Sequence, residues 1–237
     1  MFNCLNKIIP RHCLFCLQKV SDNKDICAAC FDAIAINQSC CQRCASPIEQ
    51  LDVQHNLLCG HCLSHQHDFD QVISPFLYSK EIRYLITSLK YQKKIHFAKV
   101  LAELFIQQVK NNGNFKLPQA IIPMPMHVKR LRNRGFNQAL ELSRYFSSYY
   151  ALPLDYKSIT RSRYTDLQAG LAASERQKNV ANAFSLKNPI NYQHIAIIDD
   201  VMTTGSSADE VAKLIRNEQN KDIKIDIWTV ARAGMKH

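Results

Sequence analysis

Residues 195–210 constrain the fold more than any other stretch of this sequence. Four apolar residues, Ile195 to Ile198, form a β-type run that Asp199 and Asp200 end with two adjacent carboxylates. A hydroxyl-rich turn comes next, followed by apolar residues at helical spacing: Ala208, Val211, Ala212 and Ile215. The order of strand, turn and helix is typical of a buried parallel strand that ends at a site. We therefore expect an α/β fold in which helices flank a parallel sheet.

The turn has the chemistry of a phosphate site. A helix that begins directly after it presents free backbone N–H groups and the positive end of its dipole. The hydroxyl residues of the turn add hydrogen-bond donors, and its glycine lets the backbone approach a ligand closely; the turn consists of Thr203, Thr204, Gly205, Ser206 and Ser207. The two carboxylates would repel a phosphate but can accept hydrogen bonds from ribose hydroxyls. The stretch therefore favours a sugar phosphate over a bare anion. The alternative is a strand end that only caps a helix.

The same string resembles the phosphoribosyl pyrophosphate (PRPP) loop of type I phosphoribosyltransferases. In those enzymes the acid pair holds the ribose diol and the loop holds the 5-phosphate. The resemblance implies that Asp199 and Asp200 are the ribose-binding, catalytic pair, with Mg²⁺ bound chiefly through PRPP itself.

Eight of the ten cysteines form four C-x-x-C pairs before residue 63: Cys13, Cys16, Cys27, Cys30, Cys41, Cys44, Cys59 and Cys62. Two such pairs supply the four thiolates of a tetrahedral zinc site. Sequential grouping gives two structural zinc sites; interleaved grouping, or one loaded and one degenerate site, stays open. Cys4 and Cys40 are left over as free thiols. Residues 1–68 are therefore predicted to form a double zinc-ribbon domain whose folding depends on metal.

Charge divides the chain at the same place. Up to residue 70 there are five Lys and Arg against seven Asp and Glu, whereas the remainder has 25 against 13, a net charge of +12. The start has no apolar run long enough for a signal peptide, and no segment has membrane length. We therefore expect a cytoplasmic protein without membrane insertion, whose basic α/β domain spans residues 69–237.

Further elements follow from periodicity. Residues 71–79 are predicted to be extended with a break at Pro75, and residues 82–89 and 97–105 to be helical. Lys90, at the end of the first helix, is assigned to the phosphate pocket; a solvated lysine is the alternative. Residues 224–230 are predicted to be the last strand, with Arg232 just past its end.

A second strand, loop and helix begins at Ala120. The loop consists of Pro123, Met124, Pro125, Met126 and His127, and the cationic stretch beyond it includes Arg132 and Arg134 around Gly135. Such a stretch is either a solvated face or an anion-binding turn, and the glycine favours the anion. In a phosphoribosyltransferase the corresponding segment grips the pyrophosphate.

The polar stretch from residue 160 to 184 lacks a core-forming period and is predicted to be a lid over the diphosphate. Its candidate ligand-binding residues are Arg161, Arg163, Gln168 and Arg176. The alternative is a surface excursion. Tyr91, Phe136 and Tyr164 are candidate stacking groups for single-stranded DNA beside the basic surface.

Taken in order, these motifs resemble the ComF family of bacterial competence proteins. The most specific marker is Arg134-Gly-Phe-Asn-Gln138; the cysteine pairs, Leu89-Lys-Tyr91, Asp199-Asp-Val-Met-Thr-Thr-Gly205 and Ala231-Arg232 accompany it. The resemblance implies a double zinc ribbon joined to a type I phosphoribosyltransferase-like domain. It also implies a role in natural transformation, in which incoming single-stranded DNA is handled with a helicase-like translocase and a recombination mediator.

Three functions fit these features. The domain can be a phosphoribosyltransferase whose acceptor is unknown, since no residue stands out as a base recogniser. It can be a catalytically silent DNA-binding scaffold, or a PRPP-sensing regulator. Binding to DNA should weaken steeply with salt, whereas binding of a small diphosphate should respond less.

Overall fold

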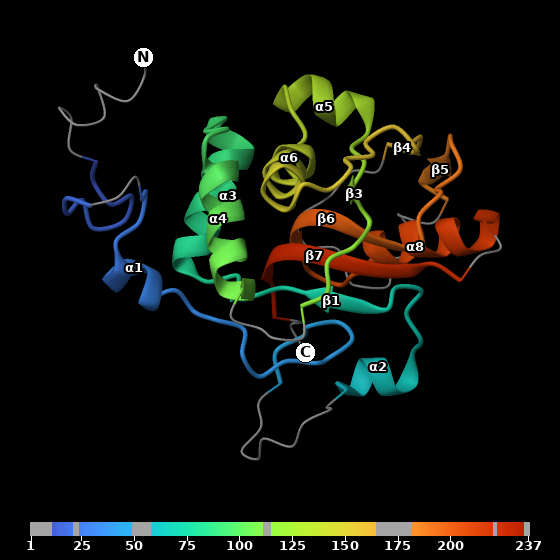
Figure 1. The fold of residues 1–237 in the computed structure, drawn as a ribbon, viewed down its shortest axis with the longest axis horizontal. Helices are drawn as coiled ribbons and strands as arrows, with labels where there is room; N and C mark the ends of the chain where they lie inside the picture. The colour runs from blue at the N-terminus through green and yellow to red at the C-terminus, as the bar shows by residue number, and fades with distance from the viewer. Residues whose placement is uncertain are drawn as a thin grey trace.

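The computed structural model describes residues 11–20, 24–48, 58–110, 115–164, 182–219 and 222–234. A parallel sheet lies at its centre, with strand order β1, β7, β6, β3 and with β2 pairing farther along β7. The strands are β1 (Gln71–Ile73), β2 (Phe76–Leu77), β3 (Ala120–Pro123), β6 (His194–Met202) and β7 (Lys224–Arg232). This arrangement confirms the predicted fold class (Figure 1).

Helices connect and flank these strands. They are α3 (Lys80–Gln92), α4 (Phe97–Lys110), α5 (Val128–Arg134), α6 (Gln138–Tyr150) and α8 (Ser206–Gln219). Two five-residue helices, α1 (Ala28–Asp32) and α2 (Gly60–Ser64), belong to the cysteine-rich part. An antiparallel pair, β4 (Ile159–Arg161) and β5 (Phe184–Leu186), stands beside the main sheet.

Both faces of the sheet are buried, which explains the unbroken apolar run in β6. Ala196 and Ile198 pack on one face with α3, α4 and α6, whereas Ile195 and Ile197 pack on the other with α8 and β5. Trp228 of β7 is fully buried on the first face, against a ring of aromatic side chains: Phe105, Phe115, Phe146 and Tyr150.

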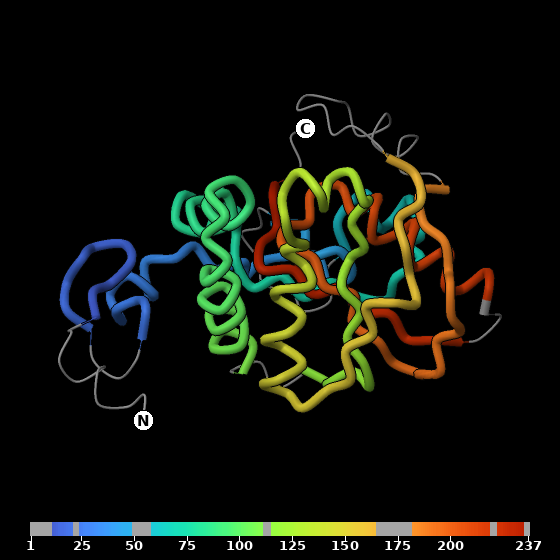
Figure 2. Tube along the Cα trace, turned by 90° about the horizontal axis from the view of Figure 1, so that it is seen from above, coloured from blue at the N-terminus to red at the C-terminus, as the bar shows by residue number. Residues whose placement is uncertain are grey.

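The cysteine-rich part is packed against the α/β part in two places. Around α1, Cys13 and Ile26 join the core of α3 and α4, and Phe15 makes an edge contact with Tyr84 at 6.5 Å. Figure 2 shows this segment, in dark blue, beside the green helix pair at one end of the molecule. The next segment extends the sheet, because Ile36 forms an antiparallel bridge with Phe76 of β2.

Three elements differ from the sequence-based predictions. Strand β6 continues through the acid pair to Met202, because its pairing with β7 persists beyond Asp199. The cationic stretch after His127 is helical, as α5, and Arg232 is the last residue of β7 instead of lying past its end.

No helix in the described ranges is both long enough and apolar enough to cross a bilayer.

Candidate functional site

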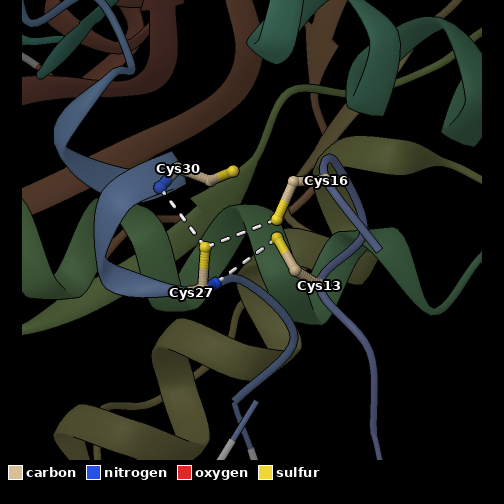
Figure 3. A group of neighbouring side chains, drawn as sticks. All are labelled: Cys13, Cys16, Cys27 and Cys30. Carbon is tan, nitrogen blue, oxygen red and sulfur yellow. Dashed lines mark hydrogen bonds between the residues drawn. The ribbon is translucent and has the colours of Figure 1, made fainter. Parts of the chain in front are cut away.

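The paired cysteines form two clusters in the sequential grouping. The sulfur atoms of Cys13, Cys16, Cys27 and Cys30 lie within 4.8 Å of one another, as do those of Cys41, Cys44, Cys59 and Cys62. In the first cluster, shown in Figure 3, the backbone N–H of Cys27 donates to the Cys13 sulfur at 3.4 Å, and that of Cys30 donates to the Cys27 sulfur at 3.4 Å. Helix α1 carries Cys30 of the first cluster and α2 carries Cys62 of the second, and the two helices lie well apart (Figure 1).

The electrostatics of the second cluster fit a cation. A hydrogen bond from the Cys44 thiol lowers the pKa of Cys41 to about 4, whereas burial raises the pKa of Cys62 to about 12. Four thiols this close cannot all ionise unless a cation offsets their repulsion. Soft thiolates in fours are the ligand set of structural zinc. Cys40 is a partly buried free thiol beside the cluster, and Cys4 lies outside the described residues.

The acid pair lies near the carboxyl end of β6, and the two acids differ in their surroundings. Asp200 is only 2% exposed, whereas Asp199 is partly exposed. The Asp199 carboxylate accepts a hydrogen bond from the backbone N–H of Asp200 at 2.8 Å. Asp199 is therefore the acid more open to a ligand.

Lys90 lies at the end of α3 against the acid pair. Its Nζ is 2.5 Å from Oδ2 of Asp200. Burial acts to lower the pKa of Lys90, but the Asp200 carboxylate more than offsets this and raises it. The lysine is therefore a fixed positive charge beside the two acids, not a solvated helix-end side chain.

The turn after β6 opens α8 as predicted. Gly205 has a φ of +84°, which favours glycine, and the hydroxyl of Thr204 accepts a hydrogen bond from the N–H of Ser206 at 3.4 Å. Thr203 is exposed, and Ser206 and Ser207 are partly exposed. The turn thus presents hydroxyl groups at the amino end of a 14-residue helix.

The loop after β3 lies next to the acid pair, because Pro123 pairs with Ile198 in neighbouring parallel strands. Met124 is buried, and its carbonyl accepts a hydrogen bond from Asn137 at 3.1 Å. Pro125 and Met126 are partly exposed. His127 caps α5, since its Nδ1 accepts a hydrogen bond from the N–H of Lys129 at 3.2 Å. These contacts fix the backbone between the strand and the cationic helix.

Helix α5 carries its cations beside exposed aromatic rings. Arg134 lies over Tyr91 at 5.8 Å from the ring centroid, and Lys129 lies over Tyr164 at 5.4 Å. Both tyrosines are exposed, and so is Arg132. Phe136 is buried, so its prediction as a stacking group is wrong: it belongs to the core that α3, α4 and α6 share.

The predicted lid is described only at its two ends. Arg161 lies over the ring of Phe184 at 5.2 Å, and burial lowers its pKa, with Arg130 adding to the effect and Asp199 opposing it. It therefore stands within electrostatic reach of the acid pair. Arg163 is exposed. Gln168 and Arg176 fall outside the described residues.

Arg232 was absent from the predicted site, yet it joins the second cysteine cluster to the turn. Its side chain is 1% exposed and donates to the carbonyls of Cys44 at 3.0 Å, Met202 at 3.1 Å and Ala233 at 2.9 Å. It also donates to the carbonyl of Thr203. An arginine at a strand end gave no sequence signal for this role, because its partners are backbone atoms from distant segments.

Substituting Asp199 should change how stability depends on pH. Partial burial, reinforced by the neighbouring Asp200 carboxylate, raises the pKa of Asp199 to about 7, against an ordinary value near 3.9. Between about pH 4 and 7 the folded state therefore binds a proton that the unfolded state lacks, and the unfolding free energy falls as pH rises. In Asp199→Asn this pH-dependent contribution to the unfolding free energy disappears, while the amide oxygen can still accept the hydrogen bond from the backbone N–H of Asp200.

We expect the variant to gain on the order of 1–4 kcal/mol relative to wild type between pH 4 and 7. Urea unfolding of both zinc-loaded proteins at several pH values measures this difference. A difference that does not change with pH contradicts the assignment.

Comparison with known proteins identifies the family to which this chain belongs. The family model described as a double zinc ribbon domain matches residues 4–63. Over 228 residues the chain is 34% identical to Competence protein F of Haemophilus influenzae, covering 93% of this chain and 96% of that protein. The chain belongs to the ComF family.

Other relatives of this ComF-family chain have related descriptions. The DNA utilization protein YhgH of Salmonella typhimurium is 30% identical over 94% of the chain and 98% of its own length. Competence protein ComFC of Streptococcus pneumoniae is 24% identical over 63% of each chain. The family match and the two four-cysteine clusters together support structural zinc in this ComF chain.

Proposed function

We propose that this protein acts in competence, in the handling of incoming DNA, and that its α/β part binds PRPP or a related sugar phosphate with Mg²⁺. The names of the relatives, Competence protein F and DNA utilization protein, support the first part. The second part is carried by one observation: Asp199 and Asp200, the latter ion-paired with Lys90, lie at the end of β6 just before the hydroxyl-rich turn that opens α8.

In this proposal each segment has a distinct task. The Asp199 carboxylate accepts hydrogen bonds from the ribose hydroxyls. Asp200 holds Lys90 beside the site through their ion pair. Hydroxyls and N–H groups of the turn bind the 5-phosphate. The loop after Pro123 and the cations of α5 face the diphosphate, and Arg161 reaches it from the β4 side. Mg²⁺ would neutralise the diphosphate oxygens.

Transfer of the phosphoribosyl group would release the diphosphate to these cations, with the acceptor unassigned. A PRPP sensor would use the same residues without turnover. We further propose that the double zinc-ribbon domain spans residues 1–68, that the α/β domain spans residues 69–237, and that the protein works in the cytoplasm.

We propose that single-stranded DNA binds along α5. The pairing of cations with exposed rings favours this surface, because successive bases stack on aromatic side chains while cations contact the phosphates. The helix follows the carboxyl end of β3, so the DNA would pass beside the sugar-phosphate site.

Fluorescence anisotropy of a labelled single-stranded oligonucleotide tests this surface. In wild type, the logarithm of the affinity should fall steeply with the logarithm of the salt concentration. Arg132→Gln should reduce the salt slope by about 0.7, since one phosphate contact to a single strand is lost. Lys116→Gln, which removes an exposed cation before β3 at the opposite end of the strand, is the matched control. Equal slopes for the three proteins would rule out α5 as the DNA surface.

A further inference from the structure

A second group of metal-ligating side chains adjoins the second cysteine cluster. Ring nitrogens of His61 and His67 and the sulfur of Cys62 lie within 4.8 Å of one another. His61 and Cys62 are neighbours in α2, and the His61 and His67 rings are stacked with centroids 5.3 Å apart. Cys62 thus belongs to two sets of ligands at once.

His67 is oriented as metal-binding histidines are. Its Nδ1 is 2.6 Å from Oδ2 of Asp209, and the other oxygen of that carboxylate accepts from the N–H of Asp68 at 3.1 Å. An Nδ1–H that donates to a carboxylate leaves the lone pair on Nε2, and such a carboxylate is the usual outer partner of a zinc-bound histidine.

The Nε2 atom of His67 is buried and has no hydrogen-bond partner among the described residues. The side chain as a whole is 4% exposed and stacks on Phe69 with centroids 4.5 Å apart. A buried polar atom without a partner is costly, and native structures seldom leave one. A cation bound between His67, His61 and Cys62 would satisfy it.

Charge favours the same conclusion. Four thiolates around one Zn²⁺ carry a formal charge of −2. Among the Lys and Arg side chains that the structure describes, only Arg232 is fully buried, at the Cys44 carbonyl. A second divalent ion that shares the Cys62 thiolate would neutralise the pair of sites. Two imidazoles and a thiolate suit zinc or cobalt, with the fourth position left for water.

We propose that His61, Cys62 and His67 form a further metal site, in which a zinc-like divalent ion shares Cys62 with the second four-cysteine cluster. A cavity of about 480 Å³, lined by His67, Asp68 and Arg216 among others, lies beside one of the three ligands. Through Asp209 the site connects α2 to α8, the helix that the hydroxyl-rich turn opens. This proposal does not depend on PRPP or DNA binding.

Cobalt(II) titration of the full chain, preloaded with two equivalents of zinc, tests the site. Native mass spectrometry counts the ions, and visible absorption reports tetrahedral cobalt with a single thiolate. Wild type should bind one cobalt beyond the two zinc ions. His61→Ala, which removes an exposed side chain, and His67→Ala should bind none. Asp209→Asn should bind cobalt about 10–100-fold more weakly, because only the outer partner is changed.

His65→Ala is the matched control, since this ring stacks on His61 at 4.6 Å but lies outside the three-ligand group. It should bind cobalt as wild type does. The proposal is overturned if zinc-loaded wild type binds no further ion, or if both histidine variants bind it unchanged. It is also overturned if His61→Ala releases one of the first two zinc ions, because the histidine would then be a ligand of the four-cysteine cluster itself.

Discussion

Removal of zinc from this protein is expected to unfold its cysteine-rich part and to loosen the sheet edge at β2. Structural zinc contributes on the order of 10 kcal/mol or more to the folding of small zinc modules. Here the two clusters replace a conventional core, and the segment between them pairs with β2 through Ile36. Losing the metal should therefore expose Phe76 and the adjoining face of α3.

Hydrogen exchange before and after chelation measures this effect. Amides that donate to cysteine sulfur, such as those of Cys27 and Cys59, should lose protection first, and added zinc should restore it. Cys41→Ser should reproduce the loss of protection at the Cys59 amide but leave the Cys27 amide protected, because Cys41 belongs to the second cluster alone. Cys40→Ser, a change at the adjacent free thiol, should leave both amides protected. Full protection in the chelated protein would show that zinc does not hold this part together.

Arg232→Met is expected to cost about 3–4 kcal/mol of stability and to disorder the turn after β6. The variant keeps an unbranched apolar stem but removes every donor, so the carbonyls of Cys44, Met202 and Thr203 lose a buried partner. Because the same guanidinium contacts the second cysteine cluster and the turn, we expect sugar-phosphate affinity to fall by at least tenfold.

Thermal unfolding and calorimetric titration of the zinc-loaded variant measure the two effects. Arg232→Lys should recover only part of the stability and part of the sugar-phosphate affinity, since an ammonium group cannot donate hydrogen bonds to several carbonyls with the planar geometry of a guanidinium. Arg144→Met, whose side chain is 60% exposed, is the control and should change stability by less than about 0.5 kcal/mol. A loss in Arg232→Met no larger than this would show that the bridge is dispensable.

The parallel sheet could be predicted because its signals are local. The Ile195–Ile198 run, buried on both faces, and the helical spacing after Ser207 each lie within one short window of sequence. The cysteine pairs were equally local. Their sequential grouping depends on contacts between the pairs, with the four sulfur atoms of each cluster close together and backbone N–H groups donating to sulfur within it.

The contacts between distant segments could not be predicted. Arg232 donates to Cys44, 188 residues away, and His67 pairs with Asp209 across 142 residues. Neither pair has a spacing that periodicity can detect. The end of β6 was also missed, because hydrogen bonding to β7 carries the strand through two acids that propensity alone would exclude.

The central claim is that the acid pair and the turn after it form a sugar-phosphate site. Isothermal titration of PRPP with Mg²⁺ into the zinc-loaded protein tests it, with a single-stranded oligonucleotide present or absent. We expect wild type to bind PRPP in both conditions, but more weakly with the oligonucleotide, because both ligands use the cations of α5. The double variant Asp199→Asn, Asp200→Asn should lose PRPP while still binding the oligonucleotide. Asp222→Asn, a change at a fully exposed acid, should bind PRPP as wild type does. If folded, zinc-loaded wild type gives no binding heat with PRPP at any Mg²⁺ concentration, the proposed site is wrong.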